Sequence, residues 1–186
     1  MLIWVSLATI VLVSLWTILI YNRLVFYKNE VQNAWKQIDV QLKRRHDLIP
    51  NLVSVVKGYM AYERETLERV VSARTIAMSS PGVREKASAE SVLTLALQRL
   101  FAVMENYPVL KSNESVLELQ EELKSTENKI AFSRQFYNDL VANFRTKMEV
   151  FPNSIIAALF GFSKVEYFSA EEEDKLRPSA EIVDRP

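Results

Sequence analysis

Three glutamates, Glu63, Glu90 and Glu127, are the residues best placed to do chemistry. Helical periodicity puts Glu63 and Glu90 on the inward faces of two predicted helices, and Glu127 beside the inward face of a third. Carboxylates from several helices bind di-iron centres in bundles, but those centres also need a Glu-x-x-His pair on each of two helices. The chain has one histidine, His46, with Lys43 where that glutamate would stand. We therefore expect no metal site.

The alternative role for these acids is structural. Charged groups inside a helical bundle are tolerated when they are paired, and such pairs can fix the register of the helices. Arg45, Arg74 and Arg134 are the predicted partners. A cryptic carboxylate-bridged metal protein remains the competing hypothesis.

The other residue types in the sequence offer few groups that could take part in catalysis. His46 could act as a pH switch, but between Arg45 and Asp47 at a predicted helix junction it reads as a capping or solvated residue. The absence of cysteine excludes disulfides, thiolate metal sites and a cysteine nucleophile. Lys plus Arg and Asp plus Glu number 23 each, so no overall charge favours nucleic acid. We expect no enzyme activity, no catalytic, cofactor-binding or metal-binding residue, no cofactor, and no small-molecule substrate.

The elements that carry these residues are predicted to be helices. Only three Gly and six Pro are present, which favours an all-α fold. Apolar residues recur every three or four positions over about 23–46, 48–79, 83–106 and 113–151. The breaks are predicted at Pro50, at the Ser79–Gly82 turn and at Pro108. A long helix merely kinked at Pro50 is the alternative to the first break.

The last of these segments has the most regular pattern. Its apolar residues form a coiled-coil-like heptad seam from Val116 to Phe151, and Pro152 ends it. At about 1.5 Å per residue this helix would exceed roughly 50 Å. Short connections then predict an elongated, antiparallel up-and-down four-helix bundle over residues 23–152.

Residues 1–22 are predicted to form a transmembrane anchor. They contain no charged side chain, and Leu2–Ile20 is long enough to cross a hydrocarbon core of about 30 Å. Trp4 and Tyr21 lie near the two ends, where aromatic rings favour the interface. A cleaved signal peptide would show a basic start and a small-x-small cleavage site, and neither is found. We therefore expect residues 2–20 to contact the lipid bilayer.

Flanking charge predicts the orientation. No Lys or Arg precedes the span, whereas basic residues from Arg23 to Arg45 follow it. Because basic loops stay in the cytoplasm, we expect the N-terminus outside and the bundle inside.

The C-terminal part falls into two pieces. Residues 153–168 contain the apolar run Ile155–Phe162, which is too short to cross a bilayer. It could lie on the membrane surface, but we expect it to pack on the end of the bundle. Residues 169–186 are charged and contain proline, which predicts a partly disordered tail.

Several stretches of the chain form a distinctive set of motifs. The most specific is Arg44-Arg45-His46-Asp47-Leu48-Ile49-Pro50-Asn51. Others are Tyr21-Asn22-Arg23-Leu24-Val25, Val31-Gln32-Asn33-Ala34-Trp35, Tyr107-Pro108-Val109-Leu110-Lys111, Glu127-Asn128-Lys129-Ile130, Tyr137-Asn138-Asp139 and Gly161-Phe162. Together these stretches resemble the LemA family of bacterial membrane proteins. One departure is Phe144-Arg145, where members often carry an aromatic residue followed by Asn. The resemblance implies an N-terminal anchor, a four-helix bundle and a bacterial inner-membrane location, but no transferable biochemical activity.

These observations lead to one functional expectation and two alternatives. We expect a membrane-anchored scaffold or interaction protein that binds unidentified proteins or further copies of itself. The first alternative is a protein that organises or shapes the membrane surface, and the second is the carboxylate-bridged metal protein. The sequence does not name the partner, the pathway or the oligomeric state.

Overall fold

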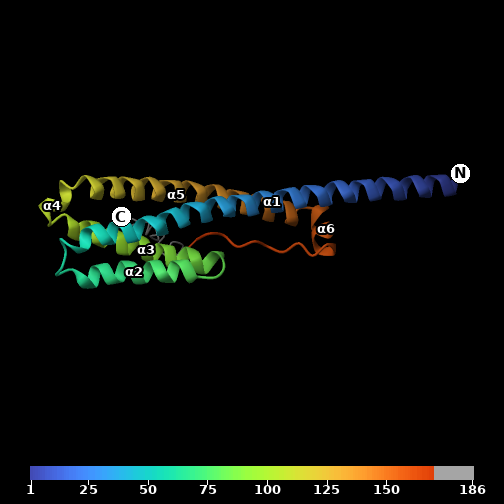
Figure 1. Ribbon diagram of the computed structural model, residues 1–186. Helices are drawn as coiled ribbons and strands as arrows, with labels where there is room; N and C mark the ends of the chain where they lie inside the picture. The colour runs from blue at the N-terminus through green and yellow to red at the C-terminus, as the bar shows by residue number, and fades with distance from the viewer. Residues whose placement is uncertain (170–186) are drawn as a thin grey trace, which may run out of the picture. The chain divides into compact units, whose positions relative to one another are not determined.

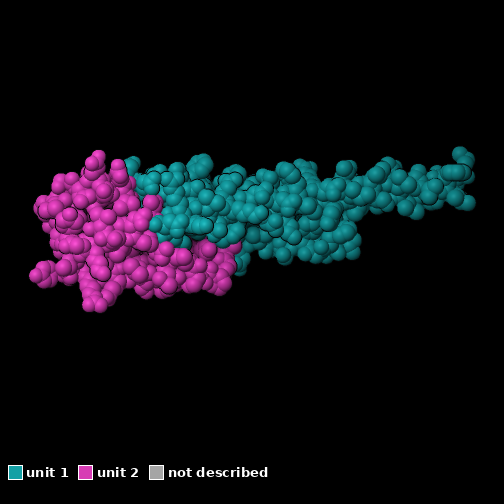
Figure 2. Space-filling view, viewed as in Figure 1, with its two compact units in different colours: residues 1–47, 121–167 teal, residues 48–120, 168–186 magenta. Residues whose placement is uncertain are grey.

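The structure is a computed structural model that describes residues 1–169, and its helices are shown in Figure 1. No strand occurs among these residues, so the predicted all-α class is confirmed. The chain divides into two compact units, coloured separately in Figure 2. Unit 1 combines residues 1–47 with residues 121–167, and unit 2 is built on residues 48–120.

The first helix, α1 (Leu2–Lys57), is continuous through Pro50. The break predicted near residues 45–50 is therefore wrong, and the long-helix alternative is right. Proline costs about 3 kcal/mol inside a helix. Ile49, Leu52 and Val56 are all fully buried, and aligning them on one face requires the helix to continue past Pro50. Burial of that apolar face outweighs the missing hydrogen bond.

The segment 48–79, predicted as a single second helix, instead contains the end of α1 and the whole of α2 (Arg64–Ser79). α1 ends at Lys57, and α2 begins seven residues later. Gly58 follows the last residue of α1, and glycine is the residue most favoured just beyond a helix end. Residues 58–63 connect α1 to α2.

Unit 1 is built on an antiparallel pairing of α1 with α5 (Glu114–Glu149). Arg44 Nη2 lies 2.8 Å from Glu122 Oε1, and the rings of Trp35 and Tyr137 have centroids 5.6 Å apart. Residue numbers thus fall along α5 as they rise along α1. The short helix α6 (Asn153–Leu159) completes the unit.

Unit 2 contains α2, α3 (Val83–Met104) and the four-residue α4 (Pro108–Lys111). α2 packs on α3 across the turn that ends at Gly82. Gly82 has a φ of 74°, which a residue with a Cβ rarely adopts, so glycine suits this turn. The core of the unit is aliphatic and includes Leu67, Val70, Leu93, Leu97 and Leu100.

The sequence-based helix ranges 83–106 and 113–151 agree with α3 and α5 to within two residues at each end. α5 has 36 residues and is therefore about 54 Å long. The arrangement of four helices as one elongated bundle stays a prediction. The predicted tail lies outside the described residues, apart from Ser169.

Candidate functional site around Tyr21

The first twenty residues of the chain carry apolar side chains that face outward all round. Leu2, Leu12 and Leu19 are 87%, 66% and 67% exposed, and the first buried residue is Leu24. A helix that is apolar on every face and unpacked needs an apolar solvent. These residues form a candidate membrane span, and they associate the protein with a membrane.

Within residues 1–169, α3 is the other helix that is long and apolar enough to cross a bilayer. Its leucines at 93, 97 and 100 are buried in unit 2, and it carries Glu90 and Arg99. That combination is typical of a core helix in a soluble region.

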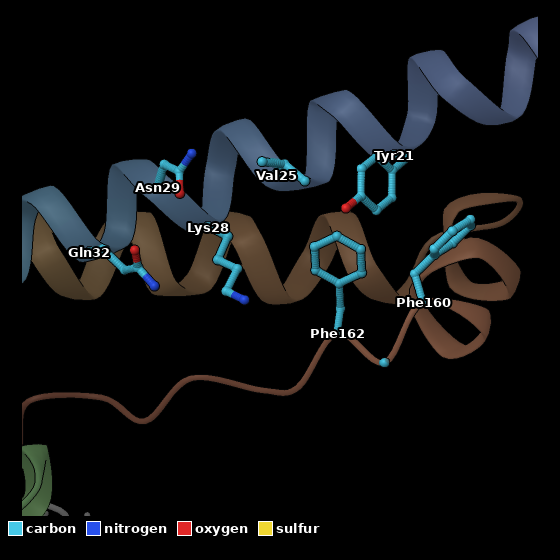
Figure 3. A pocket seen from close by; sticks show the side chains of 8 residues that line it. Tyr21, Val25, Lys28, Asn29, Gln32, Phe160 and Phe162 are labelled. Atoms are coloured by element: carbon cyan, nitrogen blue, oxygen red, sulfur yellow. The ribbon is translucent and has the colours of Figure 1, made fainter.

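A pocket of about 360 Å³ opens in unit 1 where the apolar part of α1 ends (Figure 3). Tyr21 lies at one end of it, with ring centroids 4.8 Å from Phe160 and 5.8 Å from Phe162. The amino group of Lys28 lies 5.9 Å from the centre of the Phe162 ring, a favourable cation–π arrangement. Val25, Asn29, Gln32 and Gly161 complete the lining.

Gly161 determines how these aromatic residues are presented. It has a φ of 68°, and two hydrogen bonds close the end of α6 around it. Phe162 N donates to Ala157 O at 2.9 Å, and Gly161 N donates to Ala158 O at 3.3 Å. This pair of bonds is a Schellman motif, in which glycine allows the left-handed turn. The turn brings both Phe160 and Phe162 against Tyr21.

The segment after α6 is held along α5 by polar contacts. Tyr137 Oη donates to Glu166 O at 2.8 Å, and Arg145 Nε donates to Val165 O at 2.9 Å. The Arg145 guanidinium also lies 4.4 Å from the centre of the Tyr167 ring. Arg145, at the position where the sequence departs from the LemA pattern, thus has a defined structural role.

The packing of this segment shifts the pKa values of two ionisable groups, Tyr137 and Glu149. Burial is the main reason that the pKa of Tyr137 rises to about 12, and the nearby Glu166 carboxylate adds to the effect. Lys164 Nζ donates to Glu149 Oε1 at 2.7 Å, and this hydrogen bond lowers the pKa of Glu149. The segment is therefore fixed by neutral and ionic bonds together.

The pocket is suited to binding. Its lining combines aromatic rings, one ammonium group and the side-chain amides of Asn29 and Gln32. These groups can donate hydrogen bonds to a polar or anionic group while the rings contact apolar atoms. The eight lining residues include neither a carboxylate nor a nucleophile beside a base.

The three glutamates singled out from the sequence have different environments. Arg45, whose side chain is 2% exposed, donates from Nη2 to Glu127 Oε2 at 3.1 Å, which confirms the predicted pairing. Glu90 is buried on α3, also as predicted. Glu63 is not on the inward face of a helix, since it immediately precedes α2. Its carboxylate accepts a hydrogen bond from Tyr107 Oη at 3.3 Å.

Partial burial and the Glu63 carboxylate both raise the pKa of Tyr107. Glu63 and Glu90 belong to unit 2, whereas Glu127 belongs to unit 1. Among residues 1–169, no three His, Cys, Asp or Glu side chains are grouped where they could share a metal ion. The expectation of no metal site stays a prediction.

The interpretation of His46 as a capping or solvated residue is wrong, because its side chain is buried. The helix junction that motivated that interpretation does not exist. With α1 continuous, His46 falls four residues after the buried Leu42 and three before the buried Ile49. It therefore lies on the inward stripe. Asp47 is an exposed residue within the helix and caps nothing.

Two features were missed by sequence reasoning. The pocket around Tyr21 depends on residues about 140 positions apart, and only Gly161 signalled a turn there.

The second feature is a motif near the end of α1. Ser54 and Lys57 have Ser-x-x-Lys spacing, a nucleophile motif in some acyl-transfer enzymes. Both side chains are exposed to solvent at the end of α1, whereas an activated nucleophile and its base are held together in a cleft. The match does not indicate a site.

Comparison with known proteins gives one consistent result. A sequence model of the LemA family matches residues 34–182. The chain is 28% identical over 161 residues to Protein LemA of Metamycoplasma hominis, covering 83% of this chain and 71% of that protein. It is 24% identical to Magnetosome protein MamQ 1 of Paramagnetospirillum magneticum and 25% identical to Magnetosome protein MamQ of Magnetospirillum gryphiswaldense. Each MamQ match covers 80% of this chain but only 64% of the relative. The chain belongs to the LemA family.

Proposed function

We propose that this protein is a membrane-anchored helical interaction protein without catalytic activity. The observation that carries the proposal is the continuity of α1, which runs without a break from its exposed apolar residues into the packed part of unit 1. From Leu24 onward the same helix buries residues against its neighbours. The anchor and the folded part are therefore one rigid element within unit 1, which suits a protein that holds partners at a membrane.

Two exposed aromatic side chains on α5 support this proposal. Phe132 is 76% exposed and Phe136 is 45% exposed. They lie one helical turn apart, so their rings share one face of the helix. Exposed aromatic pairs are the usual anchors of protein interfaces, and isolating them from water on binding contributes much of the affinity. The partner is another protein or a second copy of this chain.

The test uses the full chain with an affinity tag, purified from its native membranes. We expect the double substitution Phe132→Asp and Phe136→Asp to remove a partner that co-purifies with the unaltered chain. Ile76→Asp is the matched control, because Ile76 is 55% exposed on α2 and belongs to the other unit. Retention of every partner by the double variant would refute the role of this face.

We further propose a bacterial inner-membrane location with the folded part in the cytoplasm, on the basis of the basic residues that follow the span. Alkaline phosphatase fused after residue 60, in the loop between α1 and α2, should be inactive because this enzyme matures only outside the cytoplasm. Green fluorescent protein fused at the same position should be fluorescent. High phosphatase activity would reverse the orientation.

A second candidate function is organisation of the membrane surface. It is favoured by one specific observation, the exposed apolar side chains around α6. Phe151 is 80% exposed and Leu159 is 72% exposed. Under this function the folded part would bind lipid as well as protein.

A further inference from the structure

The residues around α6 form an unusual surface in unit 1. We call Val150, Phe151, Ile155, Leu159 and Phe160 the α6 apolar surface; their exposed fractions range from 44% to 80%. α6 itself, Asn153–Leu159, has no charged side chain. The flanking charges Glu149 and Lys164 are paired with each other at 2.7 Å. The large apolar side chains of this surface are thus exposed, and the charges of Glu149 and Lys164 beside them neutralise each other.

The depth of this surface relative to a bilayer follows from one contact. Leu2–Ile20 contains 19 residues and spans about 29 Å, which matches the thickness of a hydrocarbon core. Tyr21 therefore lies at the edge of that core. Phe160 packs directly on Tyr21, with ring centroids 4.8 Å apart. The end of α6 is consequently at the same level as the boundary between hydrocarbon and headgroups.

We infer that the α6 apolar surface is a second membrane contact, inserted into the leaflet from which α1 emerges. This inference rests on the proposed anchor and adds to it the lipid-binding element beside the span. Amphipathic elements at this depth gain by placing aromatic and aliphatic side chains among the acyl chains near the headgroups. A bilayer is the occupant because any partner covering Phe160 would have to displace headgroups at the level of Tyr21.

The charge distribution agrees with a lipid surface. Arg23 and Lys28 follow Tyr21 on α1, and their side chains are exposed. Lys28 lines the pocket beside Phe162, so an anionic phosphate could bind there while the α6 apolar surface enters the leaflet. Figure 3 shows the Lys28 side chain extending toward the segment that carries Phe162.

A second contact has a mechanical consequence. The tilt and rotation of a single transmembrane helix are set by its hydrophobic length and by the residues that anchor it at the interface. A lipid-inserted element on one side of that helix fixes the rotation of unit 1. The exposed Phe132 and Phe136 face would then hold one orientation relative to the membrane.

Site-directed labelling tests this inference on the full chain. The sequence has no cysteine, so one introduced cysteine carries a nitroxide label without competition. The variant is Leu159→Cys, reconstituted into vesicles of phosphatidylcholine and phosphatidylglycerol. Collision rates with oxygen, which concentrates in lipid, and with a water-soluble nickel chelate report the label's surroundings. Ile155→Cys serves as an independent reporter from the same surface.

Two control positions frame the measurement. Leu12→Cys reports the anchor, and Val40→Cys reports an apolar side chain that is 63% exposed about 30 Å beyond Ile20 along α1. We expect the ratio of oxygen to nickel collisions at residue 159 to exceed that at residue 40 several-fold and to remain below that at residue 12, which lies near the centre of the hydrocarbon core.

Each other outcome refutes a defined part of the proposal. A label at residue 159 that behaves like residue 40, with residue 12 in lipid, would overturn the second contact and leave the anchor intact. Nickel access at residue 12 would overturn the anchor. Shielding of residue 159 from both reagents would mean that protein covers it, which also overturns the inference.

Discussion

The phenol of Tyr137 on α5 donates a 2.8 Å hydrogen bond to the backbone carbonyl of Glu166, 29 residues further along the chain. Its ring also packs against Trp35 of α1. One buried side chain thus connects α1 and α5 with the segment that follows α6. Because that segment carries Phe162, Tyr137 helps to position the pocket and the α6 apolar surface.

The first prediction concerns the pH dependence of this bond. The pKa of Tyr137 is raised to about 12 in the folded protein, against about 10 in an unfolded chain. A raised pKa means that the phenol stabilises the fold fully below about pH 10 and loses this contribution as pH rises toward 12. Tyr137→Phe should lower the free energy of unfolding by about 1 kcal/mol at pH 7. The difference between variant and parent should shrink above pH 10.

Urea unfolding of the full chain in detergent micelles, measured from pH 7 to 12, provides the comparison. Tyr62→Phe is the control, because Tyr62 is 97% exposed and should show no difference at any pH. A Tyr137→Phe difference that grows above pH 10 would contradict the assigned hydrogen bond.

The second prediction concerns the core of unit 1. Phe144 is 1% exposed and its ring packs edge-on with that of Phe162, with centroids 6.4 Å apart. Phe144→Ala should reduce the free energy of unfolding by about 3–5 kcal/mol, because it removes a buried ring and leaves a cavity. Phe132→Ala, on the exposed face of the same helix, should change it by less than about 0.5 kcal/mol. Equal effects in urea unfolding would show that the faces of α5 are assigned wrongly.

The helices that could be read from the sequence were those with long apolar periodicity and clear ends. α3 lies between the Pro81-Gly82 turn and Pro108, and α5 ends just before Pro152, so local signals determined both. The prediction for α1 was wrong because Pro50 was expected to break the helix, as its local propensity indicates. Tertiary burial of Ile49 and Leu52 decided that case, and burial of this kind is not visible in local propensity.

The site could be predicted only in part for a similar reason. Glu127 was singled out because it lies beside the inward face of its helix, and Arg45 was one of three basic residues predicted to pair with the inward acids. Tyr21 and Phe160 are 139 positions apart, and no periodicity relates them. Their contact follows from the antiparallel pairing of α1 and α5 together with the turn at Gly161, which only the folded chain reveals.

The third prediction tests the continuity of α1. Pro50 lies inside the helix and cannot donate to the carbonyl of His46. Pro50→Ala should raise the free energy of unfolding by about 1–2 kcal/mol, because the restored hydrogen bond outweighs the greater freedom of the unfolded chain. Pro81→Ala, in the turn before α3, should instead leave stability unchanged or lower it by up to about 1 kcal/mol. Destabilisation by Pro50→Ala would support a real break at this position.

The last prediction separates the structural and metal-binding roles of the inward acids. Glu90 is 4% exposed on α3, so its carboxylate is held where an uncompensated charge would be costly. If its role is structural, Glu90→Gln disturbs a buried ionic arrangement and should lower the melting temperature by roughly 5–15 °C. A chelator should then leave the melting of the unaltered protein unchanged. Glu118→Gln, at an exposed position of α5, should melt like the parent.

Under the metal-binding alternative, a chelator lowers the melting temperature of the parent, and Glu90→Gln abolishes that response. The two roles thus predict opposite results in the same thermal scan, and chelator-sensitive melting of the parent would establish the carboxylates as ligands.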